Sequence, residues 1–254
     1  MNLSAVLITK NEAHIIGQTL AQLDWCNEII VVDSGSTDGT VEICQSLGCK
    51  VVHHDFADFS SQKQFAINLA ANNWILSLDA DEVLSPELRQ ELIALCAAGN
   101  VTGMAGFQLP FRVMYMGRIM RWCGLARESH LRLFDRAQGA YGNSAVHESF
   151  TVAGPCGSLR YPVIHHTCQN IADHLAKMNQ YTDYAASDYQ QRKIRGSKLR
   201  TIVQFPFKFL AMFIFKGGVF DGYPGFMWSL MHAMYCTVKY AKVYEHSASA
   251  KPSC

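Results

Sequence analysis

The first hundred residues alternate between short apolar runs and segments with helical periodicity, and this alternation constrains the fold more than any other feature. Apolar or β-branched runs of strand length occur at 3–9, 28–33, 50–53 and 74–79. Helical spacing or helix-start signals lie at 12–23, 41–47, 61–72 and 86–98. Such succession with short connections predicts βαβ units, and hence an α/β fold with a mostly parallel sheet flanked by helices. In sheets of this kind, ligands bind at the carboxyl ends of the strands.

Beyond residue 100 the pattern becomes mixed. Short runs at 106–113, 131–134 and 159–165 predict strands joined by irregular loops, and 170–191 predicts a helix. We therefore divide the chain at these changes of pattern into residues 1–100, 101–190 and 191–254, the last being a basic, amphipathic helical segment.

Composition excludes several classes of protein. The 254 residues are 49% hydrophobic and 17% charged, which excludes a disordered chain, and the mean hydropathy of +0.03 excludes a many-pass membrane protein. Nine cysteines, an odd number without a Cys-x-x-Cys pair, indicate neither a zinc knuckle nor a disulfide framework. No basic stretch precedes the first apolar run, so we expect no signal peptide and a cytoplasmic protein with reduced thiols.

Carboxylates gather at the end of the fourth predicted strand. Asp79 and Asp81 are separated by Ala80 and followed directly by Glu82. Carboxylates crowded in this way repel one another unless a cation lies among them, and oxygen ligands suit Mg2+ or Mn2+. A strand that ends in solvated acids before a helix is the structural alternative, since Asp-x-Asp also occurs by chance.

Two further polar clusters follow predicted strands. Asp33 begins the turn 33–38, where Ser34 and Ser36 lie, and its carboxylate is suited to accept hydrogen bonds from a base or a ribose. Thr9 and Glu12 bracket the end of the first strand. Both clusters are equally well explained as capped helix starts, so each is weak when taken alone.

In combination these segments resemble the family 2 glycosyltransferases of the GT-A type. The matching pieces occur in the order typical of that family, namely 6–12, 30–40, Lys63 with Asn68, and 74–82. Later, 132–134 and 146–148 resemble the bacterial branch that adds glucose or a similar sugar to a heptose of the lipopolysaccharide core. The resemblance implies a GT-A fold with a nucleotide-sugar-binding half at 1–100 and an acceptor-binding half at 101–190.

The resemblance also implies roles for single residues. The nucleotide sugar would be bound by residues from several segments, namely Thr9, Glu12, Asp33, Ser34, Ser36, Lys63, Asp79 and Ala80. Asp81 and Asp79 would bind the metal. His165 is a further candidate ligand, with a buried structural histidine as the alternative.

An inverting displacement requires a base for the proton of the acceptor hydroxyl. Glu148, in the His147-Glu148 pair, is our first candidate and Asp135 the second, with a surface acid as the alternative for Glu148. Arg127, Arg132 and Arg136 are candidates for binding an anionic acceptor, or else solvated surface residues.

The C-terminal part is strongly basic. Residues 189–244 contain nine Lys or Arg and one acid, Asp221, giving 9 − 1 = +8 in a chain whose net charge is +1. Five phenylalanines between 205 and 215, with Lys208 among them and Lys216 directly after, favour helices that lie at an anionic membrane surface. Packing on the catalytic domain or on another subunit is the alternative, and we expect no nucleic-acid binding because no recognised motif is present.

These observations predict a metal-dependent enzyme that moves a hexose, glucose from UDP-glucose by the resemblance, to a lipid-linked oligosaccharide core. It would act at the inner face of the cytoplasmic membrane. The sequence does not decide whether it forms a homo-oligomer. Two alternatives are a non-catalytic membrane-associated nucleotide-sugar binder and an Asp-x-Asp phosphohydrolase, although in such a hydrolase the motif should follow the first strand.

Overall fold

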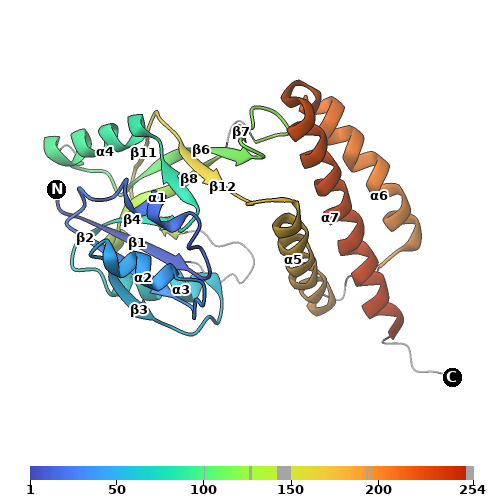
Figure 1. The fold of residues 1–254 in the computed structure, drawn as a ribbon, viewed down its shortest axis with the longest axis horizontal. Helices are drawn as coiled ribbons and strands as arrows, with labels where there is room; N and C mark the ends of the chain where they lie inside the picture. The colour runs from blue at the N-terminus through green and yellow to red at the C-terminus, as the bar shows by residue number, and fades with distance from the viewer. Residues whose placement is uncertain (100, 126–127, 142–149, 193, 195, 250–254) are drawn as a thin grey trace. The chain divides into compact units, whose positions relative to one another are not determined.

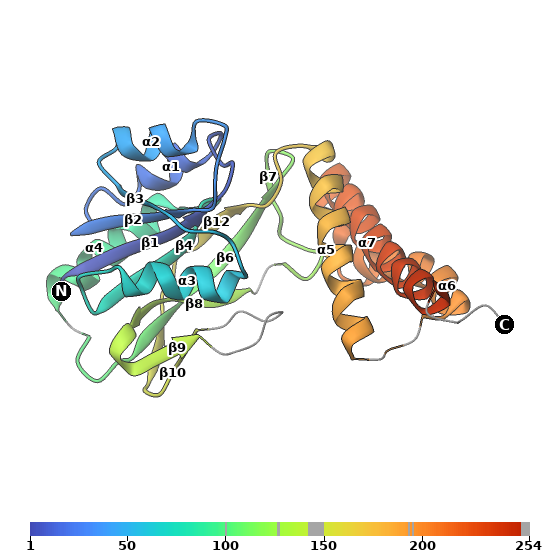
Figure 2. The same cartoon turned by 90° about the horizontal axis from the view of Figure 1, so that it is seen from below.

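The computed structural model describes residues 1–99, 101–125, 128–141, 150–192, 194 and 196–249. They form two compact units. Unit 1 comprises Met1–Arg112 and Arg127–His166, and unit 2 comprises Val113–Ala126 and Thr167–Cys254. Figures 1 and 2 show the sheet and its helices in unit 1 and the long helices of unit 2, and each unit is described by itself.

Unit 1 is built on a mixed sheet. The described strands follow the order β3-β2-β1-β4-β8-β6-β12-β5, and β11 and β7 also pair with β6. The end of β6, from Val113 on, belongs to unit 2 together with β7. The strands in this sheet are β1 (Leu3–Thr9), β2 (Glu28–Asp33), β3 (Lys50–His53), β4 (Trp74–Asp79), β5 (Glu82–Leu84), β6 (Gly106–Tyr115), β7 (Arg118–Ile119), β8 (Ser129–Asp135), β11 (Cys156–Ser158) and β12 (Val163–His166). The first four are parallel neighbours, whereas β8 pairs antiparallel with β4 and β6. A two-stranded ribbon of β9 (Gly139–Tyr141) and β10 (Phe150–Val152) forms a separate sheet, whose Phe150 stacks on Phe134 of β8.

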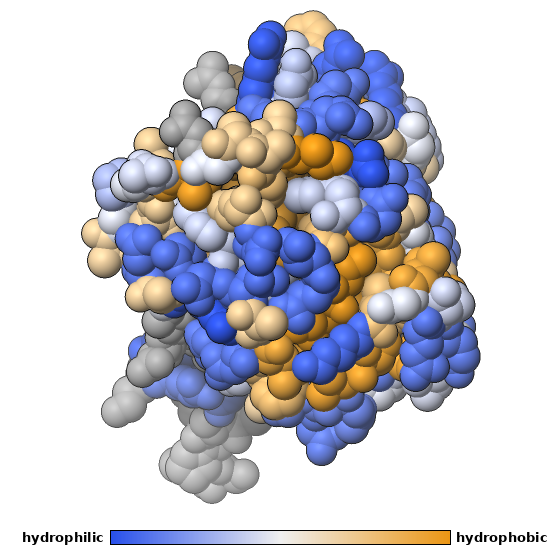
Figure 3. All heavy atoms as spheres, turned by 90° about the vertical axis from the view of Figure 1, so that its left-hand side faces the viewer, coloured by the Kyte–Doolittle hydropathy of each residue, from blue (hydrophilic) through white to orange (hydrophobic). Residues whose placement is uncertain are grey.

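Helices cover both faces of the parallel strands (Figures 1 and 2). They are α1 (Ile16–Leu20), α2 (Thr40–Ser46), α3 (Phe59–Asn68) and α4 (Pro86–Ala98), followed later by the short η1 (Arg136–Gln138). Alternate residues of each strand belong to different cores, as the period of a strand requires. Leu7 packs with the α1, α2 and α4 side, while its neighbour Val6 packs with α3. The surface drawn in Figure 3 is mostly hydrophilic, with smaller apolar areas between the polar residues.

Local signals explain where these helices begin. The Asp58 carboxylate accepts a hydrogen bond from the backbone of Ser61, and Ser85 does the same for Leu88 with Pro86 in the first turn. Such caps satisfy backbone N–H groups that a helix start leaves unpaired. The four predicted strands are confirmed at the predicted residues, whereas the helix expected over 12–23 is limited to α1.

Unit 2 is helical apart from the end of β6 and β7. Its elements are α5 (Ile171–Gln191), α6 (Lys198–Leu210), the π-helical turn η2 (Ala211–Phe215), the 3₁₀ turn η3 (Gly218–Asp221) and α7 (Gly222–Ser249). Helix α7 packs on both α5 and α6. Among the described residues, no single helix is long and apolar enough to cross a bilayer. The pair Lys198–Phe215 and Gly218–Ser247, bent by 69°, passes such a test of length and composition when the two are taken together.

The expected α/β fold with a C-terminal helical extension is confirmed. The boundaries of the compact units fall at 112/113, 126/127 and 166/167, so they do not coincide with the expected divisions at 100 and 190. Strand β6 runs from one unit into the other, and a boundary inside a strand leaves no local signal in the sequence.

Candidate active site

Three strands of unit 1 end side by side with polar residues. In the register of the sheet Thr9 pairs with Asp33, and Ile8, the neighbour of Thr9, pairs with Asp79. The carboxyl ends of β1, β2 and β4 therefore bring together residues that lie 70 positions apart in the sequence. This is the edge at which ligands bind in parallel α/β sheets.

The loops after β1 and β2 are joined by hydrogen bonds. The Asn11 amide oxygen accepts from Thr37 N (2.8 Å), and Asn11 N donates to Ser36 Oγ (2.8 Å). Glu12 N donates to Thr40 Oγ1 (2.9 Å), and Ala13 N donates to Asp38 Oδ2 (3.0 Å). The polar residues of this turn thus have the structural roles that capped helix starts predict, and they hold Thr9 and Asp33 in place.

Asp33 organises the loop that follows it. Its Oδ2 accepts from the backbone of Gly35 and Ser36, both at 2.9 Å, and its Oδ1 accepts from Ser36 Oγ at 2.5 Å. Ser34 Oγ accepts from Gln62 Nε2 (2.9 Å), which links this loop to α3. Among the described residues, the hydroxyl of Thr9 is buried without a hydrogen-bond partner. An unpaired buried polar group is costly, so this hydroxyl is a candidate to bond a ligand.

Asp79 lies in a cluster of buried charges. Lys63 Nζ, from α3, is 2.9 Å from Asp79 Oδ1, and Arg132 Nη2, from β8, is 3.2 Å from Oδ2. The same guanidinium binds the buried Glu82 carboxylate, which also accepts from Asp79 N (3.0 Å). Burial by itself would raise the pKa of Asp79, but Lys63 and Arg132 hold that pKa well below its usual range. Burial raises the pKa of Glu82, and the Arg132 guanidinium opposes this rise. Two cations and two carboxylates therefore balance within the cluster.

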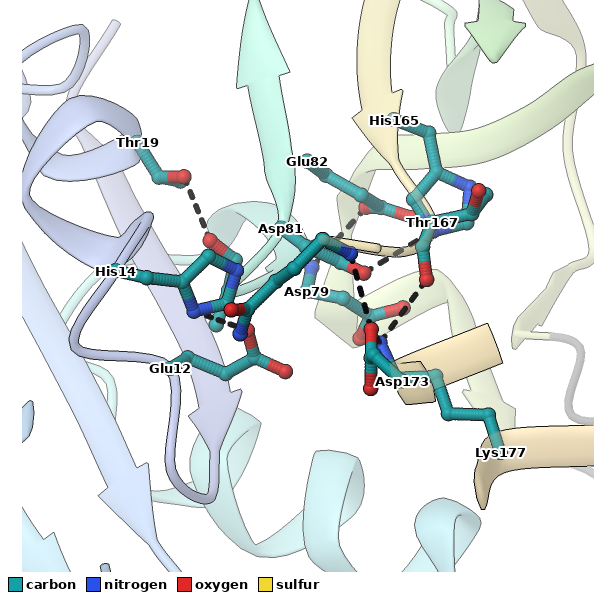
Figure 4. Close-up of polar contacts among 12 residues, drawn as sticks. Glu12, His14, Thr19, Asp79, Asp81, Glu82, His165, Thr167, Asp173 and Lys177 are labelled. Atoms are coloured by element: carbon teal, nitrogen blue, oxygen red, sulfur yellow. Dashed lines mark hydrogen bonds and ion pairs between the residues drawn. The ribbon is translucent and has the colours of Figure 1, made fainter. Parts of the chain in front are cut away.

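Asp81 lies outside that balanced cluster and contacts a histidine. His165 Nε2, at the end of β12, is 3.4 Å from Asp81 Oδ2. Figure 4 shows Asp79, Asp81, Glu82 and His165 close together, with Glu12 and His14 nearby. Burial would lower the pKa of His165, but the hydrogen bond and charge of Asp81 raise it above its usual value.

Two other expected residues have their functional atoms occupied. The side chain of Ala80 packs in the core, and its carbonyl oxygen accepts from Thr19 Oγ1 (2.6 Å). Arg136 Nη1 donates to the carbonyls of Ile67 (3.0 Å) and Ala70 (2.7 Å) at the end of α3, so it is a structural residue and is not available to an acceptor.

The structure does not bring Asp135 to this site. Asp135 pairs with Trp74 at the start of β4, whereas Asp79 is the last residue of that strand, so the two lie at opposite edges of the sheet. Its carboxylate accepts from Ala137 N (3.0 Å) and Gln138 Nε2 (2.9 Å). His147, Glu148 and Arg127 lie outside the described residues.

Comparison with known proteins identifies a family whose matching segment includes this edge of the sheet. The family model described as "Glycosyl transferase family 2" matches residues 4–145, which include all three strand ends. The chain belongs to glycosyl transferase family 2. This transferase is 30% identical over 260 residues to the lipopolysaccharide core biosynthesis glycosyltransferase LpsC of Rhizobium meliloti, covering 99% of this chain and 95% of that protein. It is 32% identical to an uncharacterised glycosyltransferase of Rickettsia felis, covering 98% and 92% of the two chains.

Among solved structures the transferase is similar to parts of larger enzymes. The match with S. aureus TarS covers 73% of this chain and 40% of that protein, at 15% identity and a TM-score of 0.48. The match with glucosyl-3-phosphoglycerate synthase from Mycobacterium tuberculosis covers 46% of this chain and 44% of that protein, at 21% identity and a TM-score of 0.36. That enzyme was crystallised with Mn2+, UDP and phosphoglyceric acid. We carry no residue role over from these partial similarities.

Two side chains at this site are candidate ligands of a cation. Within the described residues no three His, Cys, Asp or Glu side chains form a group that could hold a metal ion. Asp81 and His165 face one another and offer a carboxylate and an imidazole. Mg2+ is commonly held by one or two carboxylates together with substrate phosphates, so a cation here would need oxygen ligands from a bound diphosphate as well. As a second carboxylate ligand, Asp79 would share its oxygens with Lys63 and Arg132.

Sequence reasoning missed several residues of the site. Gln62 is fully buried and bridges Ser34 to His54, donating from its amide to the His54 carbonyl (3.0 Å). Arg132 was expected either to bind an anionic acceptor or to be solvated at the surface, whereas it pairs with Asp79 and Glu82. His14 lies 3.6 Å from Glu12. The adjacent polar pair Gln62 and Lys63 on a helix after a strand was the only available signal, because the other contacts are long-range.

Proposed function

We propose that this family 2 glycosyltransferase moves a hexose from a nucleoside diphosphate sugar to a lipid-linked glycan, with inversion at the anomeric carbon. The donor we propose is UDP-glucose, and the acceptor is a heptose of the lipopolysaccharide core or a similar sugar. The observation that carries this proposal is the meeting of Thr9, Asp33 and Asp79 at one edge of the sheet, with Asp81 and His165 beside them. The printed function of the Rhizobium relative supports the acceptor class.

The residues divide the binding of the donor between them. The unpartnered Thr9 hydroxyl and the Asp33 loop would meet the nucleoside. Asp79, held by Lys63 and Arg132, would accept from the ribose, and Lys63 would add positive charge near the diphosphate. Preorganised charges in a buried site cost no rearrangement when the reaction occurs.

In the reaction an acceptor oxygen forms a bond to the anomeric carbon as the bond from that carbon to the diphosphate oxygen breaks. The hydroxyl proton passes to a base, for which Glu148 remains our candidate. Asp81 and His165 would hold a divalent cation, which would supply positive charge to offset the charge on the departing diphosphate. Inversion follows from the single displacement in this scheme.

The proposal places the acceptor in a membrane, and hence the transferase at the inner face of the cytoplasmic membrane as a peripheral protein. The basic segment at 189–244 supports this placement, since anionic lipids attract such segments. A phosphohydrolase is disfavoured, because Asp79 lies at the end of the fourth strand rather than the first and both its oxygens contact cations. Covalent phosphorylation of Asp79 would support that alternative.

A donor panel tests the proposed reaction. The protein is incubated with several nucleotide sugars and Mn2+ or Mg2+, with and without purified lipopolysaccharide core, and nucleoside diphosphate release is followed. We expect release from a UDP-hexose that depends on the acceptor and on the metal. Binding of a donor without release under any of these conditions would identify a non-catalytic nucleotide-sugar binder, and would overturn the proposal.

A further inference from the structure

The phenylalanines of helix α6 and of the turn η2 that continues it point in two directions. Phe205, Phe209 and Phe213 form a stacked ladder with centroid distances of 6.4 and 5.5 Å, and the last two also contact Phe226 of α7. The ladder therefore forms the α6–α7 interface. Phe207 and Phe215 lie on the outside, with 62% and 84% of their surface exposed.

The outward side of this helix is a continuous apolar stripe. Its residues recur at intervals of one, three or four positions, as one helix face requires. They are Leu199, Ile202, Val203, Phe207, Leu210 and Ile214. Leu199 and Ile202 are each 71% exposed. An amphipathic helix whose apolar face is left in water is typical of a surface that meets a membrane or a partner.

A second segment of unit 2 adds to this surface. The hairpin 116–122, which follows β6 and contains β7, exposes Met116, Ile119 and Trp122. The Trp122 ring contacts Phe220 of η3, with centroids 5.1 Å apart. Gly217, between η2 and η3, has a φ of +72°, and a Cβ there would lie 2.5 Å from the Trp122 ring, so only glycine permits this close approach.

Asp221 fastens the hairpin to the break between the helices. This buried carboxylate accepts from Trp122 N (2.8 Å) and from Arg121 N (3.2 Å). Arg118 Nη1 donates to its backbone carbonyl (3.3 Å), and Cys123 N donates to the carbonyl of Lys216 (2.9 Å). The hairpin and the break are therefore one surface. We call it the docking surface, defined by residues 116–122, 215–223 and the α6 stripe.

The charge of the docking surface indicates what covers it. Asp221 is the only acid between residues 189 and 244, and it is turned inward. Residues 113–126 contain no acid. Arg118, Arg121 and Lys216 are exposed beside the apolar side chains. Basic residues that border aromatic and aliphatic side chains complement the interface of an anionic bilayer.

We propose that the docking surface inserts into the interfacial region of a bilayer that contains anionic lipid, with the hairpin 116–122 entering beside the broken helix. This inference rests on the proposed function in one respect, namely that it identifies the surface through which the transferase would reach a lipid-linked acceptor. The exposed tryptophan, phenylalanines and isoleucines bury apolar area in the lipid, and the three cations contact headgroup phosphates.

Vesicle binding by the full-length protein tests this proposal. Vesicles of phosphatidylcholine with phosphatidylglycerol are compared with vesicles of phosphatidylcholine alone, at low and high salt. We expect stronger binding to the anionic vesicles and weaker binding at high salt. The double variant Ile119→Ser with Phe215→Ser should bind at least about tenfold more weakly, because binding scales with the apolar area that is buried.

Matched controls separate insertion from general effects. Leu47→Ser with Phe56→Ser removes two apolar side chains of unit 1 that are 50% and 40% exposed, and should leave vesicle binding unchanged. Brominated phosphatidylglycerol should quench the tryptophan fluorescence of the unaltered protein, and Trp122→Phe should remove most of that quenching. Circular dichroism and thermal unfolding check that each variant is folded.

Three results would overturn the proposal. They are an unaltered protein that stays free of vesicles, a double variant that binds as tightly as its control, and a self-association that the double variant abolishes without any vesicle binding. The last would assign the surface to a second copy of the chain. Binding of UDP with Mn2+ is measured without lipid on the same variants and should not change. Vesicle binding without transfer would leave this inference standing and contradict only the proposed function.

Discussion

The two units of this chain place their charged and apolar residues in opposite ways. In unit 1, Lys63, Arg132, Asp79 and Glu82 are drawn into a balanced cluster at the end of the sheet. In unit 2, large apolar side chains such as Phe207 and Phe215 remain in contact with solvent. Buried charges and exposed apolar faces are both costly in a protein without partners. The proposals above assign a nucleotide sugar to the first arrangement and an anionic bilayer to the second.

The largest effect should come from the carboxylate that lies outside the balanced cluster. Asp81→Asn keeps the shape of the side chain but removes its charge, so transfer should fall at least about a hundredfold, as for the loss of one electrostatic group in an active site. Turnover with a saturating UDP-hexose, Mn2+ and acceptor measures this. Asp24→Asn, at an exposed acid paired with Arg89, is the control and should retain full activity. Equal activity of the two variants would contradict the role of Asp81.

The next experiment measures how much the buried charge cluster contributes to the free energy of unfolding. Arg132→Met should lower the free energy of unfolding by about 3–5 kcal/mol, because it leaves buried carboxylates without their cation. Arg89→Met breaks a surface pair of 2.7 Å with Asp24 and should cost less than about 1 kcal/mol. Urea unfolding of both variants gives the comparison. Similar losses of unfolding free energy in the two variants would show that the buried cluster stabilises the fold no more than a surface ion pair.

A third experiment compares the two sides of α6 within one helix. Phe209→Ala opens the ladder between α6 and α7 and should destabilise the protein by about 2 kcal/mol, less than the ~3–5 kcal/mol of a fully buried phenylalanine. Phe207→Ala removes an exposed side chain and should change stability by no more than about 0.5 kcal/mol in the absence of lipid. Thermal unfolding without vesicles distinguishes them. A larger loss from Phe207→Ala would mean that the outer face is packed in the free protein.

The smallest effect concerns the loops that hold the strand ends together. Burial would raise the pKa of Asp38, but hydrogen bonds from Thr40 and Ala13 lower it below its usual value. The ionised form therefore stabilises the fold above the ordinary aspartate pKa, and this contribution is lost as the pH falls through the lowered value. Asp38→Asn should thus be slightly less stable than the unaltered protein at neutral pH. This difference should disappear in acid.

Asp55 offers a matched control for that substitution. It is fully exposed and its partner is His53, at 3.2 Å. Asp55→Asn should leave the free energy of unfolding at neutral pH nearly unchanged, because an exposed ion pair contributes little. A constant difference between Asp38→Asn and the unaltered protein at every pH would instead assign the loss to packing.

Short-range signals predicted the parts of the fold that depend on them. Strand β4 and the capped helix α4 were located by an apolar run and by Ser85 with Pro86. Family resemblance then placed Asp33 and Asp79 at one site, and the register of β1 with β2 and β4 agrees with this. Strand β5 was missed because three buried residues after a turn give too short a pattern.

Long-range contacts were beyond the reach of the sequence. Arg132 was a candidate for acceptor binding or for a solvated surface position, because nothing near it in the chain reveals that β8 lies beside β4. Asp135 was a reasonable candidate by residue type, yet the antiparallel direction of β8 takes it to the opposite edge. The five phenylalanines of 205–215 were recognised as apolar, but only the packing of α7 divides them into an inner ladder and an outer stripe.

The central claim is that the ends of β1, β2 and β4 bind a nucleoside diphosphate together with a cation held by Asp81. A crystal structure of the protein with UDP and Mn2+ tests it most directly. The account predicts the uridine against Thr9 and the Asp33 loop, with the manganese ion bonded to the Asp81 carboxylate and to diphosphate oxygens. UDP bound at another place, or manganese that leaves Asp81 without a bond while UDP is present, would contradict it.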